Sequence, residues 1–493
     1  MWANSSSWRS GTLALALAGG VEFGLQMAVG VVLARYLDET AFAQYRLLWL
    51  LVGTVLAISP MFIPQSLFYF LNRVQATEKR VYVGNALMFL AAAGLVTGVV
   101  VSGTNPWQPE AAKTLFDDTA GLSALFLGLW VVASLLDALP TADGRLHLQA
   151  GATVTLAVLR TGLLVGAAML SGTMLWIALA MLLLVVTKLL MLWLYMRRHG
   201  PRGGSTWDPT VLRQQITYAI PFAVANGLFL LRVQSDQWVV VSMLPTAMYA
   251  TFSVAAVVLS VPSLIRLPVI NALMPRLNRS FGNHDLVETA RLISLSNGAM
   301  AMLLIPVAGG LFVCAPEVVE LLYTSRYRDA APVMQVYLIG MMVNAVAVGH
   351  TLPALGHGKF AAINSGVCLL LSIGLCTVGV TYFGMVGAAA ATMLTLAIGE
   401  LWALAVISRT LATTPQQLIY WRALLPALAG MAVALLAVAW MTGGWSMPLL
   451  QGLALKSMIY AAVFSLVFLL CRGVPVFSEL AGLRMRQAAE IKG

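Results

Sequence analysis

The chain has 493 residues, of which 60% are hydrophobic and only 10% are charged, and its mean hydropathy is +0.87. Soluble domains carry roughly 25% charged residues, because a packed domain must present a polar surface to water. The composition therefore excludes a soluble enzyme, a soluble nucleic-acid-binding protein and a protein with a single membrane anchor. The formal net charge of +10 then reflects membrane orientation, since Lys and Arg collect on the cytoplasmic side.

Apolar runs long enough to cross a bilayer recur along the whole chain. A spanning helix needs about 20 apolar residues, and this criterion predicts an all-α polytopic membrane protein with about fourteen transmembrane helices. The first run is longer than the apolar core of a cleaved signal peptide, which has roughly 7 to 15 residues. The predicted spans are 11–34, 47–71, 81–101, 119–140, 150–171, 174–195, 216–241, 247–268, 291–314, 331–352, 361–381, 385–407, 423–441 and 449–472.

The distribution of basic residues predicts the orientation of these spans. If the N-terminus lies inside, twenty Lys and Arg residues fall in cytoplasmic segments or at the cytoplasmic ends of spans, and five fall in outer segments. Such an excess is typical of the cytoplasmic side, so we expect both termini to be cytoplasmic. The longest cytoplasmic connections, near 196–215 and 269–290, are short. We therefore expect the chemistry to reside in the membrane helices or at their ends.

A weak internal repeat predicts two similar lobes. The pattern Leu-x4-[Phe/Tyr]-Ala-x-[Tyr/Phe] occurs at 37–45 and at 244–252, and Leu-Asn-Arg occurs at 71–73 and at 277–279. Two echoes in the same order favour parallel repeats, as in transporters that bind their cargo between repeats. We expect an N-terminal six-helix lobe over 1–200, a second six-helix lobe over 201–412, and two additional helices with a cytoplasmic tail over 413–493. The lobes are expected to surround a central cavity.

Ionisable side chains within the spans are candidates for function, because a charge in lipid is costly unless it faces a cavity or a partner. Glu22 and Arg160 lie near the centres of their spans. They predict either an ion pair within the first lobe or the lining of an aqueous cavity. Arg232 and Asp236 are four residues apart on one helix and can neutralise each other. In the functional alternative, an anionic ligand competes with Asp236 for Arg232.

The other charges within the spans have simpler explanations. Asp137, Lys188 and Lys456 lie towards the ends of their spans, where such side chains can extend to the headgroups. Glu400 is a single acid, which predicts either a carboxyl group that carries a proton or one that packs against a polar neighbour. We expect no cofactor and no metal ion, because the sequence has no phosphate-binding Gly-Lys loop and its four cysteines lack metal-ligand spacing. The cysteines are expected to be small buried side chains.

Several segments together resemble one family of transporters. Residues 37–45 and 244–255 resemble the outer loops after the first and seventh spans of polysaccharide exporters, and residues 322–333 resemble their outer segment before the tenth span. The stretch 383–392, Phe-Gly-Met-Val-Gly-Ala-Ala-Ala-Ala-Thr, matches their Gly-x2-Gly-Ala-Ala-x-Ala-Thr entry into the twelfth span. Over most of its length the chain is thus similar to the polysaccharide flippases of the multidrug/oligosaccharidyl-lipid/polysaccharide exporter superfamily. Many members have an acid at the position of Asp236, usually followed by a base, whereas Gln237 follows here.

The resemblance implies an alternating-access flippase, not an enzyme, in the inner membrane of a bacterium. Its cargo would be a polyprenyl-diphosphate-linked oligosaccharide, moved to the periplasmic leaflet for exopolysaccharide, capsule or O-antigen assembly. Its partners would be membrane lipid and polysaccharide polymerase or export machinery, and the last two helices would guide the prenyl tail or hold a partner enzyme. Cations suit a diphosphate and amides suit sugars, so the candidate cavity residues are Arg160, Arg232, Lys188, Gln26 and Asn226. The candidates for coupling to a proton or sodium gradient are Glu22, Asp236 and Glu400.

Three alternatives stay open. A multidrug antiporter of the same superfamily would exchange organic cations for H⁺ or Na⁺, and we would expect it to use acids and aromatic residues instead of central arginines. A lipid-linked peptidoglycan-precursor flippase also has fourteen spans, although the first span of this chain is not rich in arginine. A membrane glycan polymerase or acyltransferase would be expected to have a large outer loop or a buried catalytic histidine. The sequence therefore favours the polysaccharide flippase.

Overall fold

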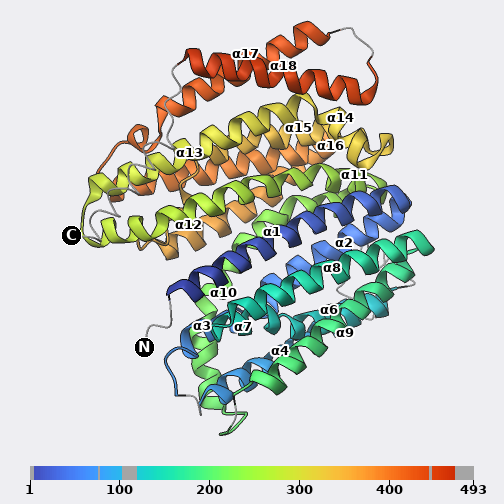
Figure 1. The fold of residues 1–493 in the computed structure, drawn as a ribbon, viewed down its shortest axis with the longest axis vertical. Coiled ribbons are helices and arrows are strands. Elements are labelled where there is room, and N and C mark those ends of the chain that lie inside the picture. The colour runs from blue at the N-terminus through green and yellow to red at the C-terminus, as the bar shows by residue number, and fades with distance from the viewer. Residues whose placement is uncertain (1–4, 76–77, 103–118, 202, 444–446, 472–493) are drawn as a thin grey trace. The chain divides into compact units, whose positions relative to one another are not determined.

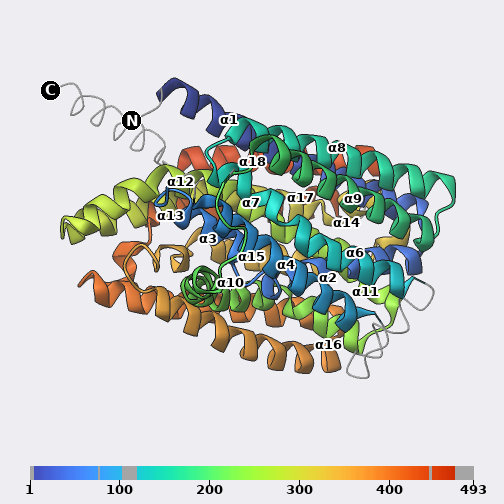
Figure 2. The same ribbon diagram turned by 90° about the horizontal axis from the view of Figure 1, so that it is seen from below.

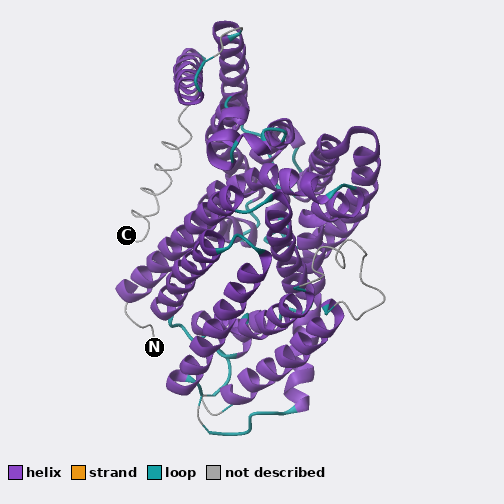
Figure 3. Ribbon diagram, turned by 90° about the vertical axis from the view of Figure 1, so that its right-hand side faces the viewer, coloured by secondary structure: helices purple, strands orange, loops and turns teal. Residues whose placement is uncertain are grey.

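The computed structural model of the chain describes residues 5–75, 78–102, 119–201, 203–443 and 447–471. Every regular element in these ranges is a helix, and none is a strand (Figure 3). Twelve of the helices are long and apolar enough to cross a membrane. Large apolar side chains lie on their outer surfaces; Leu370 is 72% exposed and Trp440 is 87% exposed. Such surfaces are suited to lipid, and the prediction of an all-α polytopic membrane protein is confirmed.

The fourteen predicted spans and these twelve helices differ at two places. One of the twelve, Gly358–Thr410, contains two predicted spans, 361–381 and 385–407, on either side of a break at Gly384. The predicted span 331–352 begins as the shorter apolar helix Ala330–Ala345. After this helix the backbone is irregular, so the span is only partly helical.

The chain divides into two compact units. The first comprises Met1–Gln234 and Pro245–Ala250, and the second comprises Ser235–Leu244 and Thr251–Gly493. In the first unit the helices are α1 (Ser5–Tyr36), α2 (Glu39–Ile58), α3 (Ile63–Phe70), α4 (Lys79–Val101), α6 (Ala120–Ala133), α7 (Leu135–Ala142), α8 (Leu146–Leu170), α9 (Met174–His199) and the first part of α10 (Pro209–Met243).

The core of the first unit is formed by helix pairs. α1 packs along α8, and α4 packs along α6 (Figures 1 and 2). Leu67 of α3, Leu90 of α4, Val131 of α6 and Leu139 of α7 are each almost completely buried in one apolar cluster. This cluster fixes the relative positions of the helices whose other faces carry polar residues.

The predicted span 47–71 is broken between α2 and α3. Met61 and Phe62 have φ angles of 45° and 61°, a region that side chains other than glycine rarely adopt. Pro60 and Pro64 flank them, and a proline cannot donate the backbone hydrogen bond of a continuous helix. The ring of Phe62 stacks on that of Phe222 with a centroid distance of 5.6 Å. The break therefore positions α3 against the first part of α10.

The second unit begins within α10. Its other elements are α11 (Thr246–Ala256, from Thr251), η1 (Val257–Ser260), α12 (Val261–Gly282), α13 (Leu286–Val313), α14 (Ala315–Tyr323), η2 (Ser325–Tyr327), α15 (Ala330–Met341), η3 (Met342–Ala345), η4 (Gly349–Thr351), α16 (Gly358–Thr410), η5 (Pro415–Leu418), α17 (Trp421–Thr442) and α18 (Leu449–Leu470). α12 and α17 both pack against α13, and α17 pairs with α18 (Figure 1).

Glycines explain the motif at 383–392. Gly384 has φ 58° and ψ −140°, so it breaks α16 into two segments. A Cβ atom on Gly387 would lie 2.0 Å from the carbonyl oxygen of Gly379, which is far inside van der Waals contact. The absence of side chains at Gly379 and Gly387 therefore allows the two segments to approach each other closely, backbone against backbone.

The repeated pattern falls at equivalent places in the chain. Residues 37–45 span the start of α2, which follows α1, and residues 244–252 span the start of α11, which follows α10. Phe42 and Tyr249, which correspond in the pattern, are each 1% exposed. The repeated residues are therefore buried packing positions. Among the cysteines, three are buried as expected, whereas Cys471 is exposed because it follows the last turn of α18.

Candidate functional site

A polar cavity of about 420 Å³ lies within the first unit. Four predicted site residues line it, namely Glu22 and Gln26 of α1, Arg160 of α8 and Lys188 of α9. Because these residues are far apart in the sequence, only the packing of α1, α8 and α9 brings them together. The structure thus assembles most of the predicted cavity residues of the first lobe around one space.

Helical periodicity directs these side chains to one place. On α8 the residues that line the cavity include Gln149, Thr153, Leu156 and Arg160, which are three or four residues apart and therefore share a helix face. α2 contributes Trp49 to the same wall. Sequence reasoning missed Gln149 and Trp49. For Gln149 a signal was present, because Thr153 and Arg160 follow it at a spacing that places all three on one face of α8.

Arg160 is buried without a carboxylate partner. Its residue surface is 7% exposed, and its guanidinium carbon lies 5.5 Å from the centre of the Trp49 ring. Its Nη2 atom has no hydrogen-bond partner within the described ranges. Glu22 also lines the cavity, but the ion pairs found among the described residues do not include a Glu22–Arg160 pair. The structure therefore favours the cavity interpretation of Arg160 over the ion-pair interpretation.

Lys188 is held in place by an acid. Its Nζ atom lies 2.7 Å from Oδ2 of Asp137 and 4.4 Å from the centre of the Trp130 ring. Lys188 is 4% exposed, so the expectation that it extends to the headgroups is wrong. Lys456 likewise forms an ion pair with Glu317 of α14. In both cases an acid on another helix compensates the charge of the lysine.

Two predicted cavity residues are not among those that line this cavity. Arg232 lies on α10 with its guanidinium carbon 5.4 Å from the centre of the Phe229 ring. Asn226 is exposed on the same helix. Gln234, which sequence reasoning missed, accepts a hydrogen bond of 2.9 Å from Thr54 of α2. This bond fastens the first part of α10 to α2.

A second polar cluster surrounds Asp236 in the second unit. The side chain of Asp236 is completely buried. Its Oδ2 atom accepts hydrogen bonds from the hydroxyl of Tyr337 at 2.7 Å and from that of Thr392 at 3.2 Å. Its Oδ1 atom accepts a bond of 2.7 Å from the backbone N–H of Gln237. Hydroxyl groups of α15 and α16 therefore satisfy this carboxyl group.

The close approach within α16 builds one wall of this cluster. Thr392 is the last residue of the motif 383–392, and it lies on the segment after the break. Cys376 lies on the segment before the break, and its Sγ atom is 3.5 Å from the hydroxyl of Thr392. Ser372, one turn earlier, exchanges a hydrogen bond of 2.8 Å with Ser235. The motif thus has a second consequence, which is to bring polar side chains of both segments towards α10.

Glu400 has a structural contact that the sequence did not predict. Its Oε2 atom accepts hydrogen bonds of 2.9 Å from the backbone N–H groups of Val348 and Gly349. Val348 lies in the irregular stretch between η3 and η4, and Gly349 is the first residue of η4, so no preceding helical turn satisfies these N–H groups. Irregular backbone at membrane depth needs such partners. This contact favours a packing role for Glu400, which was the alternative to proton transport.

Comparison with known proteins decides the family. A family model described as lipid II flippase MurJ matches residues 70–459, which is well over half of the chain. The chain belongs to the MurJ family. No protein with a curated description matches it. The sequence-based assignment to the polysaccharide flippases is therefore not confirmed, and the alternative of a peptidoglycan-precursor flippase is better supported.

Solved structures show that this MurJ family member has the fold of the larger superfamily. A lipid II flippase MurJ in an inward closed conformation has 14% sequence identity and a TM-score of 0.69, with 92% of this chain and 98% of that chain covered. An inward-facing multidrug resistance MATE transporter of the MOP superfamily has 14% identity and a TM-score of 0.65, covering 80% and 96%. A MOP superfamily transporter from Pyrococcus furiosus has 15% identity and a TM-score of 0.55, covering 82% and 95%.

The geometry explains why the motifs could not distinguish a polysaccharide flippase from a peptidoglycan-precursor flippase. Gly387 is required by backbone contact, and the aromatic residues of the repeat are buried packing residues. The residues at such positions are determined by the fold and not by the cargo, so they do not distinguish one flippase with this fold from another. The lack of an arginine-rich first span was also a poor criterion, because α8 supplies Arg160 to the cavity.

Proposed function

We propose that this MurJ family member is an alternating-access flippase for a polyprenyl-diphosphate-linked saccharide, with the lipid-linked peptidoglycan precursor as its cargo. The proposal places the chain in a bacterial inner membrane with both termini on the cytoplasmic side. The family match supports a lipid-linked cargo. The observation that supports a diphosphate-linked cargo is the buried guanidinium of Arg160. It lines a cavity and has an Nη2 atom without a hydrogen-bond partner within the described ranges.

Arg160 suits a diphosphate better than the other cations of this unit do. A guanidinium group binds phosphate oxygens through parallel N–H bonds, and it stays charged when it is buried. Lys188 lines the same cavity, but Asp137 already neutralises it at 2.7 Å. Gln26 and Gln149 add amide groups that can bind sugar hydroxyls. We therefore propose Arg160 as the principal contact for the diphosphate, with Lys188 and the amides in supporting positions.

The proposal is tested in cells depleted of their own peptidoglycan-precursor flippase. Expression of the native chain should restore growth and should make the precursor accessible from the periplasmic side. Arg160→Gln should abolish this effect, whereas Arg409→Gln, at an exposed position on α16, should not. Immunoblotting of membranes must show equal amounts of the three proteins. Full complementation by Arg160→Gln would contradict the role of Arg160.

Because the loop motifs occur in the order found in polysaccharide exporters, a polysaccharide repeat unit is the second candidate cargo. A parallel strain that lacks its polysaccharide flippase distinguishes the two. Rescue of surface polysaccharide without rescue of peptidoglycan synthesis would indicate that this repeat unit is the cargo. The partners would then be proteins of polysaccharide polymerisation or export. Rescue of neither, together with a change in sensitivity to cationic drugs, would favour a multidrug antiporter.

We further propose that Asp236 couples transport to a proton or sodium gradient. It is a completely buried acid whose neighbours, Tyr337 and Thr392, carry hydroxyl groups that can donate or accept a hydrogen bond. Such a site can adjust to a carboxyl group with or without its proton. Glu22, which lines the cavity, is the second candidate. Asp236→Asn and Glu22→Gln should each be compared with the native chain for the dependence of transport on pH and sodium. Unchanged dependence would exclude that residue.

A further inference from the structure

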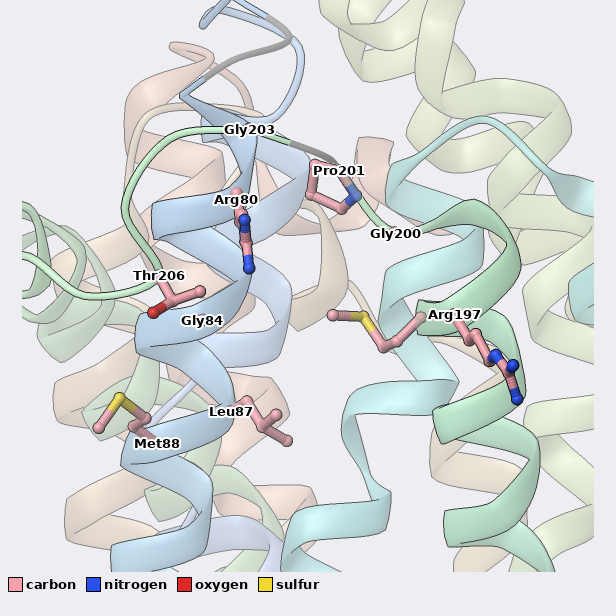
Figure 4. A pocket seen from close by; sticks show the side chains of 10 residues that line it. Arg80, Gly84, Leu87, Met88, Arg197, Gly200, Pro201, Gly203 and Thr206 are labelled. Carbon is pink, nitrogen blue, oxygen red and sulfur yellow. The ribbon is translucent and has the colours of Figure 1, made fainter.

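A second hollow of the first unit, distinct from the cavity around Arg160, lies where α4 begins and α9 ends. Its volume is about 490 Å³. The side chains of Arg80, Leu87, Met88, Met196 and Arg197 line it, together with the connecting segment after α9. Figure 4 shows Arg80 on one side and Arg197 on the other, with Gly200 and Pro201 between them. We call this hollow the α4–α9 pocket.

Backbone contacts hold the connecting segment against α4. A Cβ atom on Gly84 would lie 2.0 Å from the carbonyl oxygen of Thr206, so only glycine permits the observed approach. Two residues later in the segment, Asp208 exchanges two hydrogen bonds with Asn85. The amide of Asn85 donates to the carbonyl of Asp208 at 3.0 Å, and the N–H of Asp208 donates to the side-chain oxygen of Asn85 at 3.2 Å. The pocket therefore has a fixed wall on this side.

The charges of the pocket are positive and uncompensated. Within the described ranges, neither Arg80 nor Arg197 takes part in an ion pair. Arg197 lies over the ring of Trp193 at 5.3 Å, a contact that leaves its N–H groups able to bind an anion. This end of the first unit is also the one that the distribution of Lys and Arg assigns to the cytoplasmic side. In Figure 4 the guanidinium group of Arg197 points away from Arg80, so Arg80 supplies the charge on one wall and the exposed Arg197 supplies charge beside the hollow. This combination favours a phosphate group.

The remaining wall is apolar and continues onto the outer surface of the helices. Met88 is 50% exposed on α4, and Trp193 is 52% exposed on α9. Exposed tryptophans are typical of the level of the lipid headgroups. A soluble anion would gain nothing from Met88 and Leu87, whereas the acyl chains of a lipid can pack on them. Basic pockets between membrane helices on the cytoplasmic side bind anionic headgroups.

From these contacts we infer that the α4–α9 pocket binds the headgroup of an anionic phospholipid of the inner leaflet. Arg80 contacts the phosphate, the exposed Arg197 beside the pocket attracts it, and Leu87 and Met88 contact the start of the acyl chains. The bound lipid joins the start of α4 to the end of α9 and to the segment that leads into α10. This site differs from the cavity proposed for the cargo, so it can be tested without measuring flipping.

The test is lipid binding to the purified full-length protein, measured by native mass spectrometry with phosphatidylglycerol and with phosphatidylcholine. We expect one phosphatidylglycerol molecule to be retained in preference to phosphatidylcholine. Arg80→Gln and Arg197→Gln should each weaken its binding about fivefold, as expected for a surface charge near an anionic lipid. Arg409→Gln, an exposed arginine that does not line the pocket, should leave binding unchanged.

Two further variants separate the lipid from a free anion. Met88→Asn keeps both arginines and should weaken phosphatidylglycerol binding, because it removes apolar contact with the acyl chains. Gly84→Ala should weaken it by displacing the segment at Thr206, whereas Gly98→Ala on the same helix meets its nearest neighbour only at 3.5 Å and should not. Equal binding by the native chain and the double arginine variant would overturn the proposal. It would also be overturned if millimolar inorganic phosphate displaced the lipid and Met88→Asn had no effect.

Discussion

The hydroxyl group of Tyr337 donates a hydrogen bond of 2.7 Å to Oδ2 of Asp236, and the two residues are 101 positions apart in the sequence. Both side chains are completely buried. A buried carboxyl group without partners is costly, so the position of α15 relative to α10 is linked to the state of this acid. This link makes the Asp236 cluster sensitive to single substitutions.

Tyr337→Phe should destabilise the protein, because it removes one donor and leaves the oxygen of Asp236 less well satisfied. Losing one partner of a buried polar group costs about 1–3 kcal/mol. In the background of Asp236→Asn the same substitution should cost less, because the carboxyl acceptor has already been replaced by an amide. Thermal unfolding of the native chain, both single variants and the double variant measures the coupling between the two residues. Strictly additive effects would show that the bond contributes nothing to stability.

Gly387→Ala should be strongly destabilising. Its Cβ atom would lie 2.0 Å from the carbonyl oxygen of Gly379, so the two segments of α16 would have to separate. Gly374→Ala is the matched control on the same helix, because nothing lies within 4 Å of its Cβ position. The control should be neutral or stabilising, since alanine is favoured over glycine within a helix by up to about 1 kcal/mol. The midpoint of thermal unfolding in detergent compares the two variants, and similar midpoints would contradict the proposed backbone contact.

Glu400→Ala and Glu400→Gln should differ in stability if Glu400 supports the backbone and does not carry a proton. The alanine variant leaves the N–H groups of Val348 and Gly349 without their acceptor, at a cost of about 1–3 kcal/mol for each group. Glutamine retains a side-chain oxygen that can accept both bonds, so it should keep stability and transport close to those of the native chain. Loss of gradient-dependent transport in a well-folded Glu400→Gln variant would instead favour the coupling role.

Asp208 should make the start of α10 sensitive to strong acid. Hydrogen bonds from the hydroxyl and the backbone N–H of Thr210 lower the pKa of Asp208 below its usual value of 3.8. Because the folded pKa is the lower one, the stabilisation is present above the unfolded pKa and is lost as the pH falls through the folded pKa. We therefore expect this end of α10 to loosen only below about pH 4.

Limited proteolysis at the segment before α10 can follow this transition. Asp208→Asn provides the control, since asparagine is an equally good residue before a helix but does not titrate. Its cleavage rate should not show the acid-dependent increase that the native chain shows. An identical increase in both proteins would assign the effect to other carboxyl groups.

The sequence by itself determined the class of the protein and the position of its helices. Hydropathy and length suffice for this, because each membrane helix satisfies its own backbone hydrogen bonds and needs no distant partner. Gly384 and Gly387 were also visible as a motif, since the break in α16 favours glycine at the first position and the close approach of the two segments requires it at the second. The family was not determined in this way, because these motifs serve the packing of helices.

Only the tertiary structure decided which charges are available and which are occupied. Lys188 and Arg160 are both cations within the predicted spans, but Asp137 neutralises Lys188, whereas Arg160 keeps an Nη2 atom without a partner within the described ranges. Glu400 and Asp236 are both acids, but backbone N–H groups hold the first and hydroxyl groups surround the second. The reason is physical: the state of a charge in lipid depends on groups within a few ångströms, and packing brings those groups together from helices far apart in the sequence.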